Sequence, residues 1–235
     1  MLRPVVQITD LDTIPAITDC AAAAGAAAAV WPAAALLAAT PDRIDAWAAA
    51  NRAAGLGPPL IGADVGAFDL NTANRDGLVP RAERLAAIAE AIGSRRIVTP
   101  FGACPFGRSD EAERGYALSG LIELGLAGEV ARVWFVLQGF VAQTLLDSAE
   151  GVAAFLPVMH HRHVTFELPV DRVGEVFASL PRRFGDRVGQ YRLGTGAATR
   201  GGPVRAGVLR VIETTHNEAG DAVARVVHGE SDDSI

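Results

Sequence analysis

The chain has 235 residues, of which 50% are hydrophobic, and it carries a net charge of −6. That length fits one large domain and can bury a sizeable core. The acidic balance argues against a nucleic-acid-binding protein, which needs a concentrated basic face to gain from counterion release.

All 21 basic residues are arginine, so the sequence contains no lysine. This excludes mechanisms built on lysine, namely Schiff bases, P-loop lysines and lysine general bases. The two cysteines, Cys20 and Cys104, have neither a metal-ligand nor a Cys-x-x-Cys spacing. We expect them to be small buried hydrophobic residues.

The N-terminal segment does not follow the signal-peptide pattern, because Asp10 and Asp12 come soon after its arginine. The apolar stretch Ala21–Ala39 consists mostly of alanine and is interrupted by Gly25 and Pro32. Alanine drives membrane insertion weakly, and proline would break a spanning helix. We therefore expect a cytoplasmic protein with no membrane partner.

Short β-branched or apolar runs alternate with longer alanine-rich amphipathic segments. The predicted strands are Val5–Thr9, Ala26–Trp31, Leu60–Val65, Arg96–Thr99, Val130–Gln138, His163–Leu168, Val188–Leu193 and Ala224–His228. The predicted helices are Thr13–Ala24, Pro41–Ala54, Pro80–Ile92, Asp110–Leu126, Ala149–Val158, Asp171–Leu180 and Val204–Glu213. Such alternation predicts an α/β protein with a parallel sheet. Eight units in this length favour a closed (β/α)8 TIM barrel, one domain over residues 1–235, over an open doubly wound sheet.

The chain ends within a few residues of the eighth predicted strand. The last helix of the barrel is therefore expected to be missing or reduced to Glu230–Ile235. A barrel flank left without its helix would expose apolar surface, which predicts a partner subunit, with a homodimer as the simplest form.

Three segments resemble the xylose isomerase-like TIM barrels, the sugar phosphate isomerase/epimerase superfamily. Ile14–Pro32 (IPAITDCAAAAGAAAAVWP) resembles the opening helix, glycine turn and second strand of that family. Arg81–Gly102 (RAERLAAIAEAIGSRRIVTPFG) is similar to its third helix and fourth strand, and Glu129–Gly139 (EVARVWFVLQG) to its fifth strand. The resemblance spans nearly the whole chain and rests on hydrophobic patterns.

The resemblance implies a divalent metal bound at the C-terminal strand ends by Glu, Asp, His and Glu after strands five to eight, with a further His in an Asp-x-x-His motif. The matching positions hold Gln138, Glu167 with Val170 three residues later, Arg192 and His228. Arginine has no acceptor and cannot be a ligand, whereas these metals need carboxylate or imidazole groups. We therefore expect no metal and no other cofactor, with the charge of Arg192 in place of the cation.

The remaining polar residues suit proton transfer beside a carbonyl. We expect His228 to be a general acid/base, Arg192 to stabilise an anionic oxygen, and Glu167 to orient His228, pair with Arg192 or act as a second base, with Gln138 beside them. The predicted function is a metal-independent isomerase, epimerase, cyclase or lyase acting on a small carbonyl compound, compatible with a biosynthetic role. A metal-dependent sugar isomerase and a catalytically inactive barrel that binds a ligand or partner remain the alternatives. A structural ion pair of Glu167 with Arg192 and an exposed His228 also remain open.

Five residues at or just beyond the predicted strand ends are candidates for substrate binding: Asp64, Trp31, Phe68, Phe101 and Phe140. The aromatic residues could line an apolar pocket or plug the top of the barrel, and Asp64 could be catalytic or cap a turn. His160, His161 and His163 precede the sixth strand, which predicts a surface or N-terminal-rim position and not a metal centre.

Overall fold

The computed structural model describes residues 2–7, 11, 28–63, 68, 77–104, 111–169, 172–178, 180, 187–193 and 208–212, with the backbone alone at 2–7, 191–193 and 208–212. The predicted helix Thr13–Ala24 and the predicted strand Ala224–His228 lie outside these residues.

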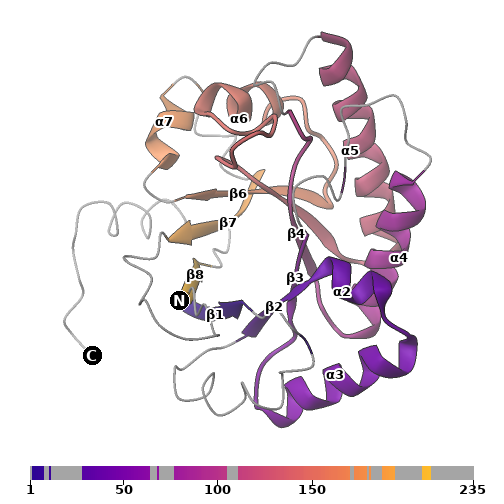
Figure 1. Cartoon of the computed structure of the whole chain (residues 1–235). Coiled ribbons are helices and arrows are strands. Elements are labelled where there is room, and N and C mark those ends of the chain that lie inside the picture. Colours follow the sequence, from indigo (N-terminus) through magenta and orange to yellow (C-terminus); the bar gives the residue numbers. More distant parts are fainter. Residues whose placement is uncertain are drawn as a thin grey trace, which may run out of the picture.

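Eight strands close into a barrel in which neighbours along the chain are neighbours in the sheet (Figure 1). The strands are β1 (Leu2–Gln7), β2 (Ala28–Pro32), β3 (Leu60–Gly62), β4 (Arg96–Pro100), β5 (Trp134–Gln138), β6 (Val164–Pro169), β7 (Val188–Leu193) and β8 (Val208–Ile212). From β1 to β7 all pairs are parallel. The predicted TIM barrel is thus confirmed.

The eighth strand differs from the prediction in place and direction. It lies within the segment predicted as the helix Val204–Glu213, and it pairs antiparallel with both β7 and β1. Val208, Val211 and Ile212 are β-branched, which favours a strand. Pairing on both sides also satisfies the free edges of β7 and β1, which a helix cannot do.

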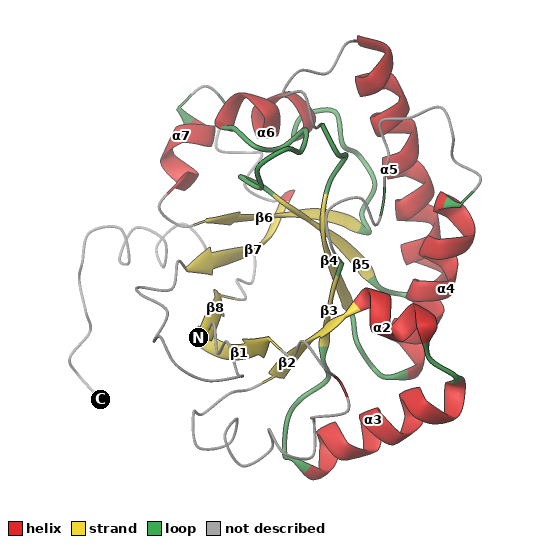
Figure 2. Ribbon diagram, in the orientation of Figure 1, coloured by secondary structure: helices red, strands yellow, loops and turns green. Residues whose placement is uncertain are grey.

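Helices cover the outside of the barrel wall from β2 to β6 (Figure 2). They are α2 (Ala33–Ala38), α3 (Pro41–Ala53), α4 (Leu78–Ala91), α5 (Glu111–Ala131), α6 (Ala149–Phe155) and α7 (Val173–Phe177). The helix α5 takes the first two residues of the predicted strand Val130–Gln138. It ends where Arg132 adopts a φ of 55° and the Val133 N–H donates to the Gly128 carbonyl, 2.9 Å away, a C-terminal capping pattern. No helix among the described residues is long and apolar enough to cross a membrane.

The strand register tells which side chains face the helices. Trp31, Ile61, Ile97 and Phe135 form one paired row across β2 to β5. Phe135 faces α5, because a Cβ built on Gly128 would lie 3.4 Å from its ring. Since successive side chains of a strand alternate, this row faces outward, and residues of the opposite parity, Gln138 among them, face the barrel interior.

Candidate functional site

Glu167 lies in the barrel interior with an amide on each side. Its side chain is 2% exposed, and the register pairs it with Gln138 of β5 and Gln190 of β7. Gln138 Nε2 donates to Oε1 over 3.2 Å, and Gln190 Nε2 donates to Oε2. Both carboxylate oxygens therefore accept a hydrogen bond.

A β-bulge brings Gln190 to this position. Phe166 pairs with Val188, whereas the next residue, Glu167, pairs with Gln190, so that Gly189 is the additional residue of β7. Without this shift Glu167 would be opposite a glycine. A Cβ on Gly189 would lie 2.6 Å from Thr165 Oγ1, so a residue with a side chain does not fit there.

Arg96, the first residue of β4, contacts the Gln190 side chain from another strand. Its Nη1 donates to Gln190 Oε1 over 3.4 Å. Arginine has only donors and a carboxylate only acceptors, so these two partners select the same orientation of the Gln190 amide. The four side chains Arg96, Gln190, Glu167 and Gln138 thus form one hydrogen-bonded chain from β4 to β7.

The described part of this site does not fit a divalent cation. Glu167 is the one acidic residue in β5, β6 and β7. A hard cation requires several oxygen or imidazole ligands directed at one point. Among the residues that the structure describes, no group of three or more His, Cys, Asp or Glu could hold a metal ion.

Three predicted substrate-binding aromatics pack in the outer layer. Trp31 belongs to the outward-facing row of the sheet, and its buried Nε1 has no hydrogen-bond partner among the described residues. The ring of Phe68 lies edge-on to Phe135 at 5.7 Å, and that of Phe101 lies edge-on to Phe155 of α6 at 5.4 Å. A position at a strand end fixes the height of a side chain and not the face on which it lies, so a substrate-binding role for these three stays a prediction that their packing does not support.

Phe140 does lie at the C-terminal rim. It follows β5 with a φ of 60° and is half-buried. The Arg172 guanidinium stacks on its ring at 4.3 Å from the centroid, and Arg172 Nη2 donates to Glu175 Oε2 over 2.7 Å. The cation–π contact joins the segment after β5 to α7, and the ion pair orients Arg172 at the start of α7.

The other predicted site residues are only partly covered. The Arg192 backbone pairs with Pro169, two residues beyond Gln190 in β7, but its side chain is outside the described parts. Asp64 and His228 lie outside the described residues. Of the predicted catalytic residues, the structure therefore brings Glu167 and Gln138 together.

Two members of the hydrogen-bonded chain, Gln190 and Arg96, were not predicted as site residues. A signal for Gln190 exists, because it precedes Arg192 by two residues and thus shares its face in a regular strand. Arg96 lies at the opposite end of its strand from the rim, and only the long reach of arginine brings it to Gln190.

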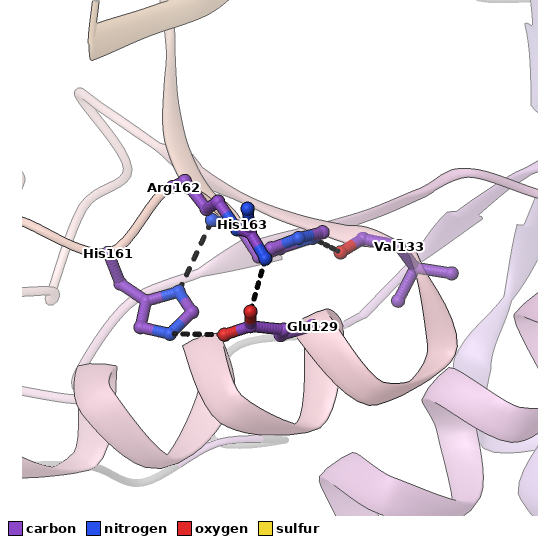
Figure 3. Close-up of polar contacts among 5 residues, drawn as sticks. All are labelled: Glu129, Val133, His161, Arg162 and His163. Carbon is purple, nitrogen blue, oxygen red and sulfur yellow. Dashed lines mark hydrogen bonds and ion pairs between the residues drawn. The ribbon is translucent and has the colours of Figure 1, made fainter.

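The histidine cluster lies at the N-terminal rim, as predicted (Figure 3). His163 is buried, and its Nδ1 lies 2.8 Å from the Val133 carbonyl. The His163 N–H donates to His161 Nδ1 over 3.3 Å, and His161 Nε2 lies 3.5 Å from Glu129 of α5. Glu129 also pairs with Arg162. The cluster joins the end of α5 to the starts of β5 and β6.

Burial lowers the pKa of His161 below its ordinary value of 6.5, and neighbouring His163 and Arg162 lower it further, whereas Glu129 opposes them. Neutral His161 fits the contacts, because Nδ1 accepts from His163 while protonated Nε2 faces the Glu129 carboxylate.

No protein-family model matches the sequence, and no curated protein sequence matches it. Solved structures do match. D-psicose 3-epimerase from Clostridium cellulolyticum H10 is 13% identical, with a TM-score of 0.65 over 86% of this chain and 73% of that one. AP endonuclease family 2 from Brucella melitensis is 8% identical, with a TM-score of 0.63 over 97% and 89%.

A xylose isomerase-like TIM barrel protein from Mycobacterium smegmatis, solved in complex with magnesium, is 15% identical, with a TM-score of 0.60 over 94% of this chain and 79% of that one. At these identities the likeness concerns the fold alone. The chain therefore shares the TIM-barrel fold of these proteins, as the resemblance of its sequence implied.

Proposed function

We propose that this protein is an isomerase or epimerase that moves a proton beside the carbonyl of a small substrate without a divalent metal. The observation that carries the proposal is the Glu167 carboxylate, held between two amides inside the barrel. Active sites of this fold lie at the C-terminal strand ends, and Gln138 is the last residue of β5. The epimerase among the similar folds supports this reaction class.

In this reaction Glu167 takes the proton from the carbon next to the carbonyl. The C–H electron pair becomes the enolate double bond, and the carbonyl oxygen takes the negative charge. Arg192 and the Gln138 amide stabilise that oxygen, and His228 returns a proton to carbon, so that no oxidant or reductant is needed. The net charge of −6 favours a small molecule over a nucleic acid as the substrate.

The test is deuterium exchange into a panel of ketoses and keto acids in D2O, read by mass spectrometry before and after exhaustive chelation. We expect exchange to survive chelation and to fall by about 10²–10⁴-fold in Glu167→Gln, since that is the contribution of a general base. Arg192→Ala and His228→Ala should also lose exchange. The control is Glu129→Gln, which removes a carboxylate at the opposite rim and should leave exchange unchanged.

Other outcomes refute the proposal. Loss of exchange on chelation with recovery on adding Mg²⁺ or Mn²⁺ would establish the metal-dependent alternative. A folded protein that catalyses no exchange in any substrate, and that binds its ligand equally well after Glu167→Gln, would establish a barrel that binds without catalysis.

A further inference from the structure

We infer that Arg96 is a positioning residue of this site: acting through Gln190, it fixes the amide orientation in which each oxygen of the Glu167 carboxylate accepts a hydrogen bond. Its consequence for catalysis rests on the proposed function, whereas its effect on the protonation of Glu167 does not. The inference concerns the N-terminal end of β4, far along the strand from the rim where a substrate would enter.

Arg96 determines the direction of the Gln190 amide. Reversing the amide would place its oxygen against the Glu167 carboxylate and its NH2 against the Arg96 guanidinium. Both new contacts would be repulsive, because each would join two acceptors or two donors. Arg96 at 3.4 Å from Gln190 Oε1 therefore favours the orientation in which Nε2 faces Glu167.

Arg96 also supplies positive charge close to Glu167. Glu167 is 2% exposed, and an ionised carboxylate in such a place requires hydrogen bonds and a compensating positive charge. Arg96 is always charged and is joined to Glu167 by two consecutive hydrogen bonds. The Gln190 amide transmits its effect, because hydrogen bonds in a chain polarise one another.

The two amide N–H groups match the ionised form of Glu167. A protonated carboxyl must itself donate one hydrogen bond, yet both Glu167 oxygens face amide N–H groups. Removing Arg96 frees the Gln190 amide to turn its oxygen toward Glu167 and accept that proton. The loss of Arg96 should therefore favour protonated Glu167.

The experiment compares wild-type protein with Arg96→Met, Gln190→Met and the double variant. Arg95→Met is the control, because it removes a neighbouring exposed arginine. The protonation of Glu167 is followed by infrared spectroscopy over pH, its carboxyl band being identified by its loss in Glu167→Gln. We expect Glu167 in Arg96→Met to bind its proton about tenfold more tightly than in wild type, Arg95→Met to match wild type, and Arg96→Lys to recover part of the difference.

If Arg96 acts through Gln190, Arg96→Met should change the protonation of Glu167 little in a protein that already carries Gln190→Met. In the exchange assay, Arg96→Met should lower kcat with little change in KM, because a turned Gln190 amide no longer holds the Glu167 carboxylate in place. Equal Glu167 protonation in Arg96→Met and Arg95→Met, or an undiminished effect of Arg96→Met in the Gln190→Met background, would overturn the inference. If Arg96→Met does not fold, Arg96→Gln replaces it with the same expected order.

The experiments distinguish a failure of the proposed function from a failure of the positioning role of Arg96. A shift in Glu167 protonation without any exchange activity in wild type would refute the proposed function and support the inference. Exchange activity with Glu167 protonation insensitive to Arg96 would do the reverse.

Discussion

Replacing Gly128 with alanine tests the junction where α5 packs against the N-terminal ends of β5 and β6. The added Cβ would lie 2.7 Å from the Val133 carbonyl oxygen and 3.2 Å from His163 Cβ. The oxygen belongs to the backbone and also accepts from His163 Nδ1, so it has little freedom to move away. His163 immediately precedes β6, the strand that carries Glu167.

The magnitude follows from two opposing effects. Overpacking a closely packed site costs about 1–3 kcal/mol, and the upper part of that range applies because the nearest atom is backbone. Alanine is more favourable than glycine in a helix by about 1 kcal/mol. Gly128→Ala should therefore lower the free energy of unfolding by about 1–2 kcal/mol, which for a chain of this size lowers Tm by about 2–8 °C.

Gly115 of the same helix is the matched control. A Cβ there would meet no atom within 4 Å, so Gly115→Ala should raise the free energy of unfolding by up to about 1 kcal/mol. Urea denaturation of the two variants measures both changes, with equal m-values as the check on two-state behaviour. A stabilising effect of both substitutions would refute the close approach of α5 to the sheet.

Two further predictions concern the site and its pH dependence. Gly189→Ala should lower the free energy of unfolding by about 1–3 kcal/mol, since its Cβ would lie 2.6 Å from Thr165 Oγ1. Gly174→Ala is the control and should not lower it, because its Cβ would meet no atom within 4 Å. Equal urea midpoints of the two variants would contradict this. The folded-state pKa of His161 is lowered by burial from 6.5, so the unfolded chain protonates first as the pH falls. The contribution of His161 to stability is complete above pH 6.5 and is lost as the pH falls from there to the folded-state pKa. In urea denaturation at a series of pH values, His161→Gln should flatten the dependence of the free energy of unfolding on pH in this range. An unchanged dependence in this range would contradict the assignment.

The barrel could be predicted because parallel strands, covered on both faces, are apolar along their whole length. The runs at β4, β5 and β6 are mostly apolar, with the inward-facing Arg96, Gln138 and Glu167 among the exceptions. Gly55 and Gly93 mark turns after their helices with φ values of 72° and 75°. The segment of β8 was ambiguous, because the spacing of Val204, Val208 and Val211 fits a helix stripe as well. Pairing with β1 and β7, which no local pattern contains, decides in favour of the strand.

The candidate site was predictable where it depended on position along a strand and not where it depended on contacts between strands. Glu167 and Gln138 could be found from their places near strand ends. Gln190 needed the bulge at Gly189, and Arg96 needed the reach of its side chain across the barrel interior. For the aromatic residues, nearness to a strand end does not give the face of the sheet, and the in-and-out alternation puts Trp31 on the side of Phe135.

The amides at Gln138 and Gln190 explain how one buried carboxylate can be held inside the barrel. A carboxylate at either position would place two negative charges within hydrogen-bond distance, which requires a cation or a shared proton. Amide N–H groups remove that repulsion, and the positive charge comes instead from Arg96, through Gln190. Without lysine, arginine is the permanent side-chain cation that the chain has for this purpose. Because Arg96 enters from the start of β4, its charge is supplied without occupying the C-terminal rim, where the proposed reaction would take place.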